Sequence, residues 1–215
     1  MSYSGDIKIC GLSTIEAVDA VIVGGATHAG FIFFTKSPRH VSVGLAAQLS
    51  DRAKAGGLKT VAVTVDVGDA ALAEIVEIMR PDIIQLHGHE TPARAADIKA
   101  LYDLPVMKAL AISETADLEK LTPFIGIADR FLLDAKPPKG AVLPGGNAVS
   151  FDWTVLKHLP ANMDYLLAGG LDESNVKDAI AIANPPGLDI SSGVESAPGI
   201  KDVGKIAAFL KAARS

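Results

Sequence analysis

The chain has 215 residues, 49% of them hydrophobic, with a formal net charge of −5 and a mean hydropathy of +0.31. No apolar run approaches the roughly 18 to 20 residues that cross a bilayer, and no basic stripe is present, which argues against a membrane protein and against a nucleic-acid-binding protein. Cys10 is the only cysteine, so no internal disulfide can form, and residues 1–6 show no signal-peptide pattern; we expect a cytoplasmic protein with one domain over residues 1–215.

Short β-branched runs alternate with longer segments rich in Ala, Leu, Glu and Lys, and this alternation repeats eight times along the chain. The expected strands are residues 7–10, 28–33, 60–65, 83–86, 106–109, 130–134, 165–168 and 188–191. The expected helices are residues 14–23, 45–55, 70–79, 92–102, 116–121, 153–158, 175–183 and 201–213. The strands are nearly continuously apolar, which is typical of parallel sheets buried on both faces.

Eight units of about 27 residues each, close to the ~30 residues of a βαβ unit, predict an α/β fold of the (β/α)8 TIM-barrel type in a single domain. The alternative is a doubly wound open sheet, which usually has five or six strands. The longest connection, residues 135–150, is rich in Pro and Gly. Because a loop of this length in a compact domain is usually functional or disordered, we interpret it as a mobile cover over the barrel mouth.

Polar residues collect at the carboxyl ends of the expected strands, where TIM barrels build their active sites. The first strand ends in Cys10 and the sixth in Asp134. These strands are three steps apart around an eight-strand ring, so their side chains should face each other across the mouth. That placement suits a general base and a general acid that act on opposite parts of one substrate. The alternatives are a small buried Cys10 and an Asp134 that caps a helix or lies at the surface.

Side chains alternate along a strand, so Lys8 shares the face of Cys10, and Asp189 shares that of Ser191. A buried lysine needs a counter-charge, for which Asp189 is one possible partner. A cation below the thiol would favour the thiolate. The alternative is that Lys8 belongs to an ordinary ion pair in the core.

Two loops at the last strand ends predict a phosphate site. Gly169-Gly170 lets the backbone approach a ligand closely, and Ser191-Ser192-Gly193 supplies hydroxyl and amide donors. Loops after the seventh and eighth strands are the usual phosphate site of such barrels. We therefore expect a small phosphorylated substrate.

Three further residues complete the candidate site. Arg39, in a loop after Ser37-Pro38, could bind a substrate carboxylate with its planar fork of donors, or lie solvated at the surface. Gln85 and His87 share one face near the end of the fourth strand. His87 is expected to contact substrate or to lie in the core, and no matched set of ligands near it predicts a metal. Lys108, on the fifth strand, is also expected near the mouth.

Taken together, these motifs resemble the phosphoribosylanthranilate isomerase family of tryptophan biosynthesis. The matching segments cover almost the whole chain in the family order: Lys8-Ile9-Cys10-Gly11, Ser37-Pro38-Arg39, Gln85-Leu86-His87-Gly88, Leu132-Leu133-Asp134, Phe151-Asp152-Trp153, Ala168-Gly169-Gly170-Leu171 and Ser191-Ser192-Gly193-Val194-Glu195. The chain departs from the family pattern at Gly145-Gly146-Asn147-Ala148, where the family often has Gly-Gly-Thr-Gly. The family includes monomers and homodimers, so either state is expected.

The resemblance implies an Amadori rearrangement without a cofactor. Asp134 would protonate the ribose ring oxygen of N-(5-phosphoribosyl)anthranilate, and Cys10, as thiolate, would remove the proton from C2′. Arg39 would hold the anthranilate carboxylate, with Gln85, His87 and Lys8 beside the substrate. Two other functions stay open: another phosphoribosyl aminoaldose isomerase or barrel synthase of amino-acid biosynthesis, and a non-catalytic sensor of phosphorylated metabolites.

Overall fold

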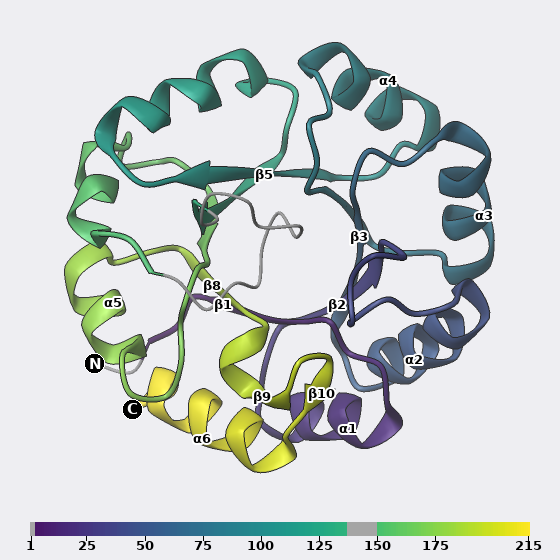
Figure 1. Cartoon of the computed structure of the whole chain (residues 1–215), viewed down its shortest axis with the longest axis horizontal. Helices are drawn as coiled ribbons and strands as arrows, with labels where there is room; N and C mark the ends of the chain where they lie inside the picture. The colour runs from purple at the N-terminus through teal and green to yellow at the C-terminus, as the bar shows by residue number, and fades with distance from the viewer. Residues whose placement is uncertain (1–2, 137–149) are drawn as a thin grey trace.

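The computed structural model describes residues 3–136 and 150–215. Eight parallel strands form a closed barrel in chain order, with β8 paired to β1, and helical segments surround them (Figure 1). The strands are β1 (Asp6–Cys10), β2 (His28–Phe33), β3 (Lys59–Thr64), β4 (Ile83–Leu86), β5 (Val106–Ile112), β6 (Arg130–Ala135), β7 (Tyr165–Leu167) and β8 (Gly187–Ile190). The predicted TIM barrel is confirmed, and the open-sheet alternative is wrong because β1 and β8 are hydrogen-bonded neighbours.

The connections between strands contain both α-helices and 3-10 helices. They are α1 (Ile15–Val23), α2 (Val43–Ala55), α3 (Asp69–Met79), α4 (Pro92–Tyr102), η1 (Thr115–Phe124), η2 (Trp153–His158), α5 (Val176–Ala183), η3 (Ser192–Val194) and α6 (Val203–Arg214). Side chains of Thr14, Ser42, Thr91 and Asp202 accept backbone hydrogen bonds at the starts of α1, α2, α4 and α6. These caps satisfy amides that a helix start otherwise leaves unpaired, which fixes where each helix begins.

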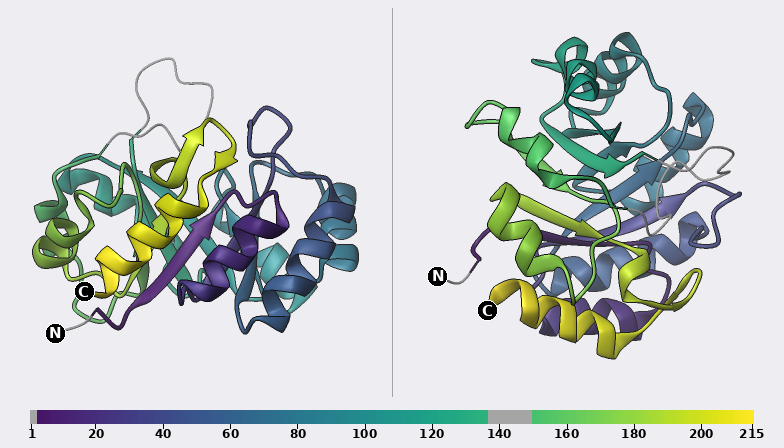
Figure 2. Two further views of the ribbon diagram at one scale, coloured as in Figure 1. Left: turned by 90° about the horizontal axis from the view of Figure 1, so that it is seen from below. Right: turned by 60° about the vertical axis from the view of Figure 1, so that its left-hand side comes forward.

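A short hairpin follows β8 where the sequence predicts the start of a helix. Strands β9 (Glu195–Ala197) and β10 (Ile200–Lys201) pair antiparallel, and Gly199 between them has φ +83°. The prediction of a helix from Lys201 is therefore wrong: Lys201 is in β10, and the helix begins after its cap Asp202. Figure 2 shows the hairpin standing on the side of the molecule toward which β1 points.

Two apolar regions hold the fold together. The main core lies between the barrel and its helices and includes alternate strand residues such as Ile7 and Ile9. Inside the barrel, smaller clusters form around Val61 and Val63 on one side and Met107 on the other. Strand residues thus alternate between the outer core and the barrel interior, as the period of two requires.

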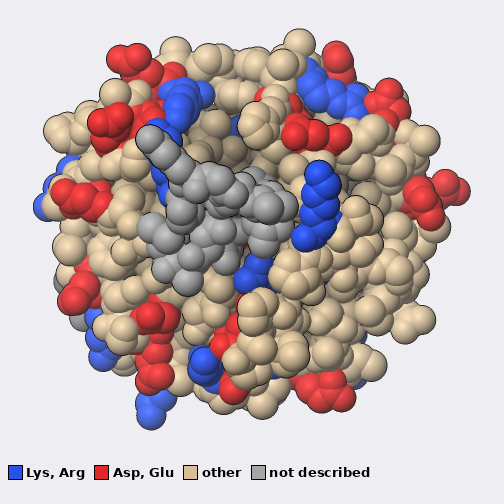
Figure 3. All heavy atoms as spheres, in the orientation of Figure 1, with Lys and Arg blue, Asp and Glu red and all other residues tan. Residues whose placement is uncertain are grey.

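The outer surface carries both charge signs. On the face shown in Figure 3, basic and acidic side chains are interspersed around the rim of the barrel. Among the described residues, no helix is long and apolar enough to cross a membrane. Residues 137–149, on which the predicted cover loop falls, lie outside the described part of the chain.

Candidate active site

Cys10 ends β1 with its side chain inside the barrel. It is 5% exposed and packs with Val61 and Val63. Lys8 is one layer below on the same strand, fully buried, and its Nζ donates to Asp189 Oδ1 at 2.6 Å. The ion pair that the sequence left open between Lys8 and Asp189 therefore exists.

Asp134, the penultimate residue of β6, lies next to a histidine that follows β4. His87 Nε2 lies 3.5 Å from Asp134 Oδ2, and Gln85 Nε2 lies 2.9 Å from His87 Nδ1. With Gln85 donating to Nδ1, the neutral imidazole carries its proton on Nε2, where it faces the carboxylate. Gln85 and His87 thus contact each other and orient a donor toward Asp134.

The two predicted phosphate loops line one cavity together with Asp134. The residues around it come from the ends of β6, β7 and β8, namely Asp134, Ala135, Ala168, Gly169, Gly170, Leu171, Asp189, Ile190, Ser191 and Ser192. Gly169 and Gly170 have φ of +88° and +63°, a region that favours glycine. Gly193 follows in η3 and is not part of this lining. The cavity combines glycine backbone and serine hydroxyls with the carboxylates of Asp134 and Asp189.

Arg39 is buried and already paired. Its Nε and Nη2 donate to the two carboxylate oxygens of Glu195 at 2.7 and 2.9 Å. Lys201 Nζ donates to the same carboxylate at 2.7 Å and to the Ser191 carbonyl at 2.9 Å, and Ser191 Oγ donates to the Cys10 carbonyl at 3.1 Å. This chain of contacts connects Arg39 to Ser191 and to Cys10, and it excludes the alternative of a solvated Arg39.

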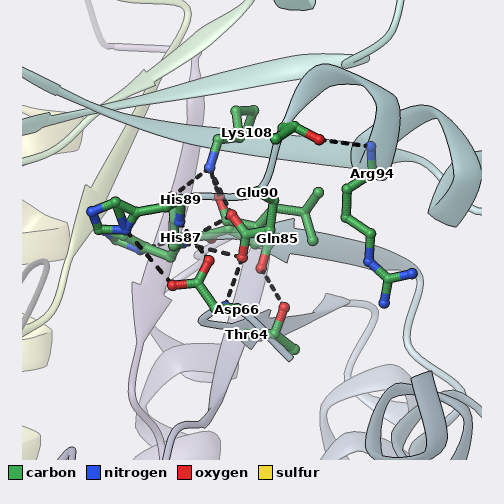
Figure 4. A network of polar contacts seen from close by, with 11 residues as sticks. Thr64, Asp66, Gln85, His87, His89, Glu90, Arg94 and Lys108 are labelled. Carbon is green, nitrogen blue, oxygen red and sulfur yellow. Dashed lines mark hydrogen bonds and ion pairs between the residues drawn. The ribbon is translucent and has the colours of Figure 1, made fainter. Parts of the chain in front are cut away.

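The loop from His87 to Glu90 rests on a second buried ion pair (Figure 4). Lys108 Nζ donates to Glu90 Oε2 at 2.7 Å and to the Gly88 carbonyl at 2.8 Å, while Glu90 accepts from the amides of Gly88 and Asp66. Lys108 is therefore behind this loop and not in the mouth, where the sequence places it. Because Lys108 shares the face of the outer-core residues Val106 and Leu110, the alternation of β5 turns it away from the barrel interior.

A model of the N-(5′-phosphoribosyl)anthranilate (PRA) isomerase family matches residues 7–212. The N-(5′-phosphoribosyl)anthranilate isomerases of Mesorhizobium japonicum and Agrobacterium fabrum are 60% and 59% identical to the chain, over 98% and 95% of its length and 95% and 92% of theirs. The chain belongs to the phosphoribosylanthranilate isomerase family. It is an isomerase of tryptophan biosynthesis.

Solved structures of this isomerase family share the fold. The phosphoribosylanthranilate isomerase of Thermotoga maritima superposes with a TM-score of 0.86 at 30% identity, covering 97% of this chain and 98% of that one. A phosphoribosylanthranilate isomerase in complex with reduced 1-(o-carboxyphenylamino)-1-deoxyribulose 5-phosphate superposes with a TM-score of 0.83 at 28% identity, covering 97% and 98%. The second protein holds a phosphorylated carboxyphenylamino sugar on this fold.

Burial and neighbouring charges shift the pKa values of Cys10 and Glu195 in opposite directions. Burial raises the pKa of the Cys10 thiol, and the nearby Lys8 ammonium opposes that rise. Burial on its own would raise the pKa of Glu195. The Arg39 and Lys201 cations outweigh burial, so the pKa of this carboxyl is lowered. Among the described residues, no group of three His, Cys, Asp or Glu side chains is arranged to hold a metal ion.

Two charged residues of this isomerase site were missed in the sequence. Glu195 stands in the Ser191-to-Glu195 motif without a role, and Lys201 was placed in a helix. The signal that could have indicated both is Pro198-Gly199, a turn dipeptide that predicts a hairpin after Glu195. The hairpin turns Lys201 back onto Ser191, to whose carbonyl its Nζ donates.

Proposed function

We propose that the chain converts N-(5-phosphoribosyl)anthranilate to 1-(2-carboxyphenylamino)-1-deoxyribulose 5-phosphate by an Amadori rearrangement, with Asp134 as general acid and Cys10 as general base. The observation that carries the proposal is that Asp134 lines the same cavity as the two glycine- and serine-rich loops. A phosphate in those loops would place the ribose between Asp134 and the tip of β1.

The reaction needs two proton transfers at different atoms of the sugar. Asp134 gives its proton to the ribose ring oxygen, the C1′–O bond breaks, and the anthranilate nitrogen forms a Schiff base with C1′. The Cys10 thiolate then removes the proton from C2′, which gives an enolamine that tautomerises to the ketone. The steps use no cofactor, since both proton transfers are within reach of side chains at the mouth.

Substrate binding is divided among the remaining predicted residues. Gly169 and Gly170 with the loop from Ser191 to Gly193 bind the phosphate. Arg39 binds the anthranilate carboxylate with the guanidinium donors that Glu195 leaves available. Gln85 and His87 line the β4 side of the mouth and hold the Asp134 carboxyl in position.

Turnover of N-(5-phosphoribosyl)anthranilate, followed as loss of its fluorescence, tests the function. We expect purified protein to consume the substrate, and Cys10→Ser and Asp134→Asn each to lower kcat by about 10²- to 10⁴-fold, the range of general acid–base residues, while KM changes little. Asp178→Asn, an exposed carboxylate on α5, is the control and should leave kcat unchanged. Absence of turnover by the unaltered protein refutes the function; unchanged kcat in either site variant removes that residue from the mechanism.

The pH profile tests the base separately. Because burial raises the pKa of the Cys10 thiol, the free enzyme holds little thiolate at neutral pH. We expect kcat/KM to rise with pH and to reach half of its maximum above the ordinary thiol pKa of about 8.5. The reason is that kcat/KM reports ionisation of the free enzyme. A rising limb that is complete below neutrality contradicts Cys10 as the group that must lose its proton.

A further inference from the structure

A fully buried ion pair lies one layer below Cys10 inside the barrel. Lys8 Nζ and Asp189 Oδ1 are 2.6 Å apart, and the lysine side chain has no exposed surface. TIM-barrel interiors are filled mainly by Val, Ile and Leu, and a well-packed apolar pair is often as stable as a buried ion pair or more so. Stability alone therefore does not account for these two residues.

The neighbouring strand leaves room for Lys8 and Cys10 to meet. Gly30 on β2 pairs with Cys10, and a Cβ there would lie 3.0 Å from both Cys10 Sγ and Lys8 Cε. Glycine inside a strand is less favourable than alanine because it loses more backbone freedom on folding and has no side chain to pack. Two unfavourable choices, a buried lysine and a strand glycine, thus occur at one place, which is the pattern expected of a functional constraint.

We propose that Lys8, held by Asp189, is a positioning residue that fixes the Cys10 sulfur and stabilises the thiolate that then takes the proton from C2′. The inference rests on the role of Cys10 as general base. Lys8 then acts through Cys10 and not by binding substrate, because its ammonium lies one layer below the thiol and forms an ion pair with Asp189.

Charged groups surround the sulfur from several elements. Lys8 on β1 and Lys201 on β10 favour the thiolate, whereas burial and the Asp189 carboxylate on β8 disfavour it, and the net effect raises the pKa of the thiol. Burial works against the charge of Lys8, yet Asp189 and Cys10 raise its pKa above the ordinary value, so Lys8 stays an ammonium ion. Arg39 packs against Gly11 beside Cys10, and its charge is paired with Glu195.

The test uses the fact that the chain has one cysteine. Thiolate formation is followed by ultraviolet absorbance against pH, with Cys10→Ser as the blank, so the signal belongs to Cys10 and needs no substrate. In Lys8→Met we expect the midpoint to rise by about one pH unit or more, which is a tenfold smaller thiolate fraction below the midpoint. In Lys8→Met/Asp189→Asn no unpaired buried charge remains to prevent folding, and the midpoint should still rise because the loss of Lys8 outweighs the loss of Asp189.

Kinetics supply the second readout. Lys8→Met should lose about tenfold in kcat at neutral pH, keep KM within a small factor, and recover kcat at alkaline pH. An unmoved midpoint, or a kcat loss of the same size at every pH, overturns the proposal in favour of a structural role. If the unaltered protein does not turn over the substrate, the proposed function fails, while the midpoint shift still decides the inference.

A matched control comes from the other buried lysine. Lys108 and Glu90 form an ion pair of 2.7 Å with side chains that are 2% and 3% exposed, on the opposite side of the sheet from the barrel interior. Lys108→Met/Glu90→Gln should leave the Cys10 midpoint where it is. A shift as large as that of the Lys8 variants would show that any loss of a buried ion pair perturbs the thiol, and would overturn the specific role of Lys8.

Discussion

One edge of the Arg39 guanidinium is bound by the Glu195 carboxylate. Glu195 accepts from Nε and Nη2, so a substrate carboxylate must use the outer donors of the same guanidinium. The fixed fork turns those donors in one direction, which a lysine cannot do. If Arg39 binds the substrate carboxylate as proposed, Glu195 sets the direction of its free donors, although Glu195 faces the cation and not the substrate.

We expect Arg39→Lys to raise KM for N-(5-phosphoribosyl)anthranilate by roughly 10- to 100-fold, because a hydrogen bond to a charged group contributes about 1.5–3 kcal/mol. The kcat value should fall much less. Arg52, which binds Asp19 through the same two nitrogens at 2.7 and 3.1 Å but on the exposed surface, is the control. Steady-state kinetics of Arg39→Lys and Arg52→Lys distinguish the two sites, and an unchanged KM in Arg39→Lys removes Arg39 from substrate binding.

At the level of single elements, the turn after β7 depends on backbone conformation. Gly169 has φ +88°, and a Cβ there would lie 2.5 Å from the Ala135 amide nitrogen at the end of β6. This contact between two backbones cannot relax by rotating a side chain. Gly126 has a similar φ of +81° but nothing within 4 Å of its Cβ position.

Substituting each of these two glycines therefore distinguishes the cost of a left-handed backbone alone from the added cost of a clash with the Ala135 backbone. We expect Gly126→Ala to lower the free energy of unfolding by about 1–2 kcal/mol, the cost of a left-handed non-glycine residue. Gly169→Ala should cost more than this and should also weaken competitive inhibition by inorganic phosphate, because the loop must move away from β6. Urea unfolding and phosphate inhibition measure the two effects; equal inhibition in both variants would place the phosphate elsewhere.

Local sequence patterns specified most elements but not those that depend on distant contacts. The strand from His28 to Phe33 and the helix from Pro92 to Tyr102 have the predicted bounds, because periodicity and caps are local. The segment after Thr115 forms a 3-10 helix with Pro123 inside it. Pro198-Gly199 indicates the turn of the hairpin after β8, but the local pattern does not show that Gly199 lies against the Pro38 carbonyl of a loop far away in the chain.

For the whole molecule, barrel closure decides which predicted residues meet. Order and alternation were enough to place Cys10 and Asp134 on β1 and β6 and to offer Asp189 as one possible partner of Lys8, which the structure confirms. They could not show that the Glu195 carboxylate accepts from Nε and Nη2 of Arg39, or that Lys108 points away from the barrel interior toward Glu90. Both contacts depend on how side chains fill the space between elements. Motifs thus identified residues at the mouth, while their partners required the structure.

A buried histidine at the opposite end of the barrel makes stability depend on pH. His28 begins β2, is 2% exposed, and its Nδ1 lies 2.7 Å from Thr27 Oγ1. Burial lowers its pKa from 6.5 to about 4; the Asp6 carboxylate opposes this, while the Arg130, Lys8 and Lys59 cations add to it. The folded protein therefore keeps His28 neutral where the unfolded chain would protonate it.

The sign of the effect follows from proton uptake. Between pH 6.5 and 4 the unfolded chain binds a proton that the folded protein does not, so stability is full above pH 6.5 and is lost as the pH falls toward 4. The difference of about 2.5 units corresponds to about 3 kcal/mol at ~1.36 kcal/mol per unit. We expect urea unfolding at several pH values in this window to show that loss, and His28→Gln to flatten it. His158→Gln, at an exposed position, should keep the slope of the unaltered protein. A slope that persists unchanged in His28→Gln would assign the pH dependence to other groups, because the glutamine binds no proton in either state.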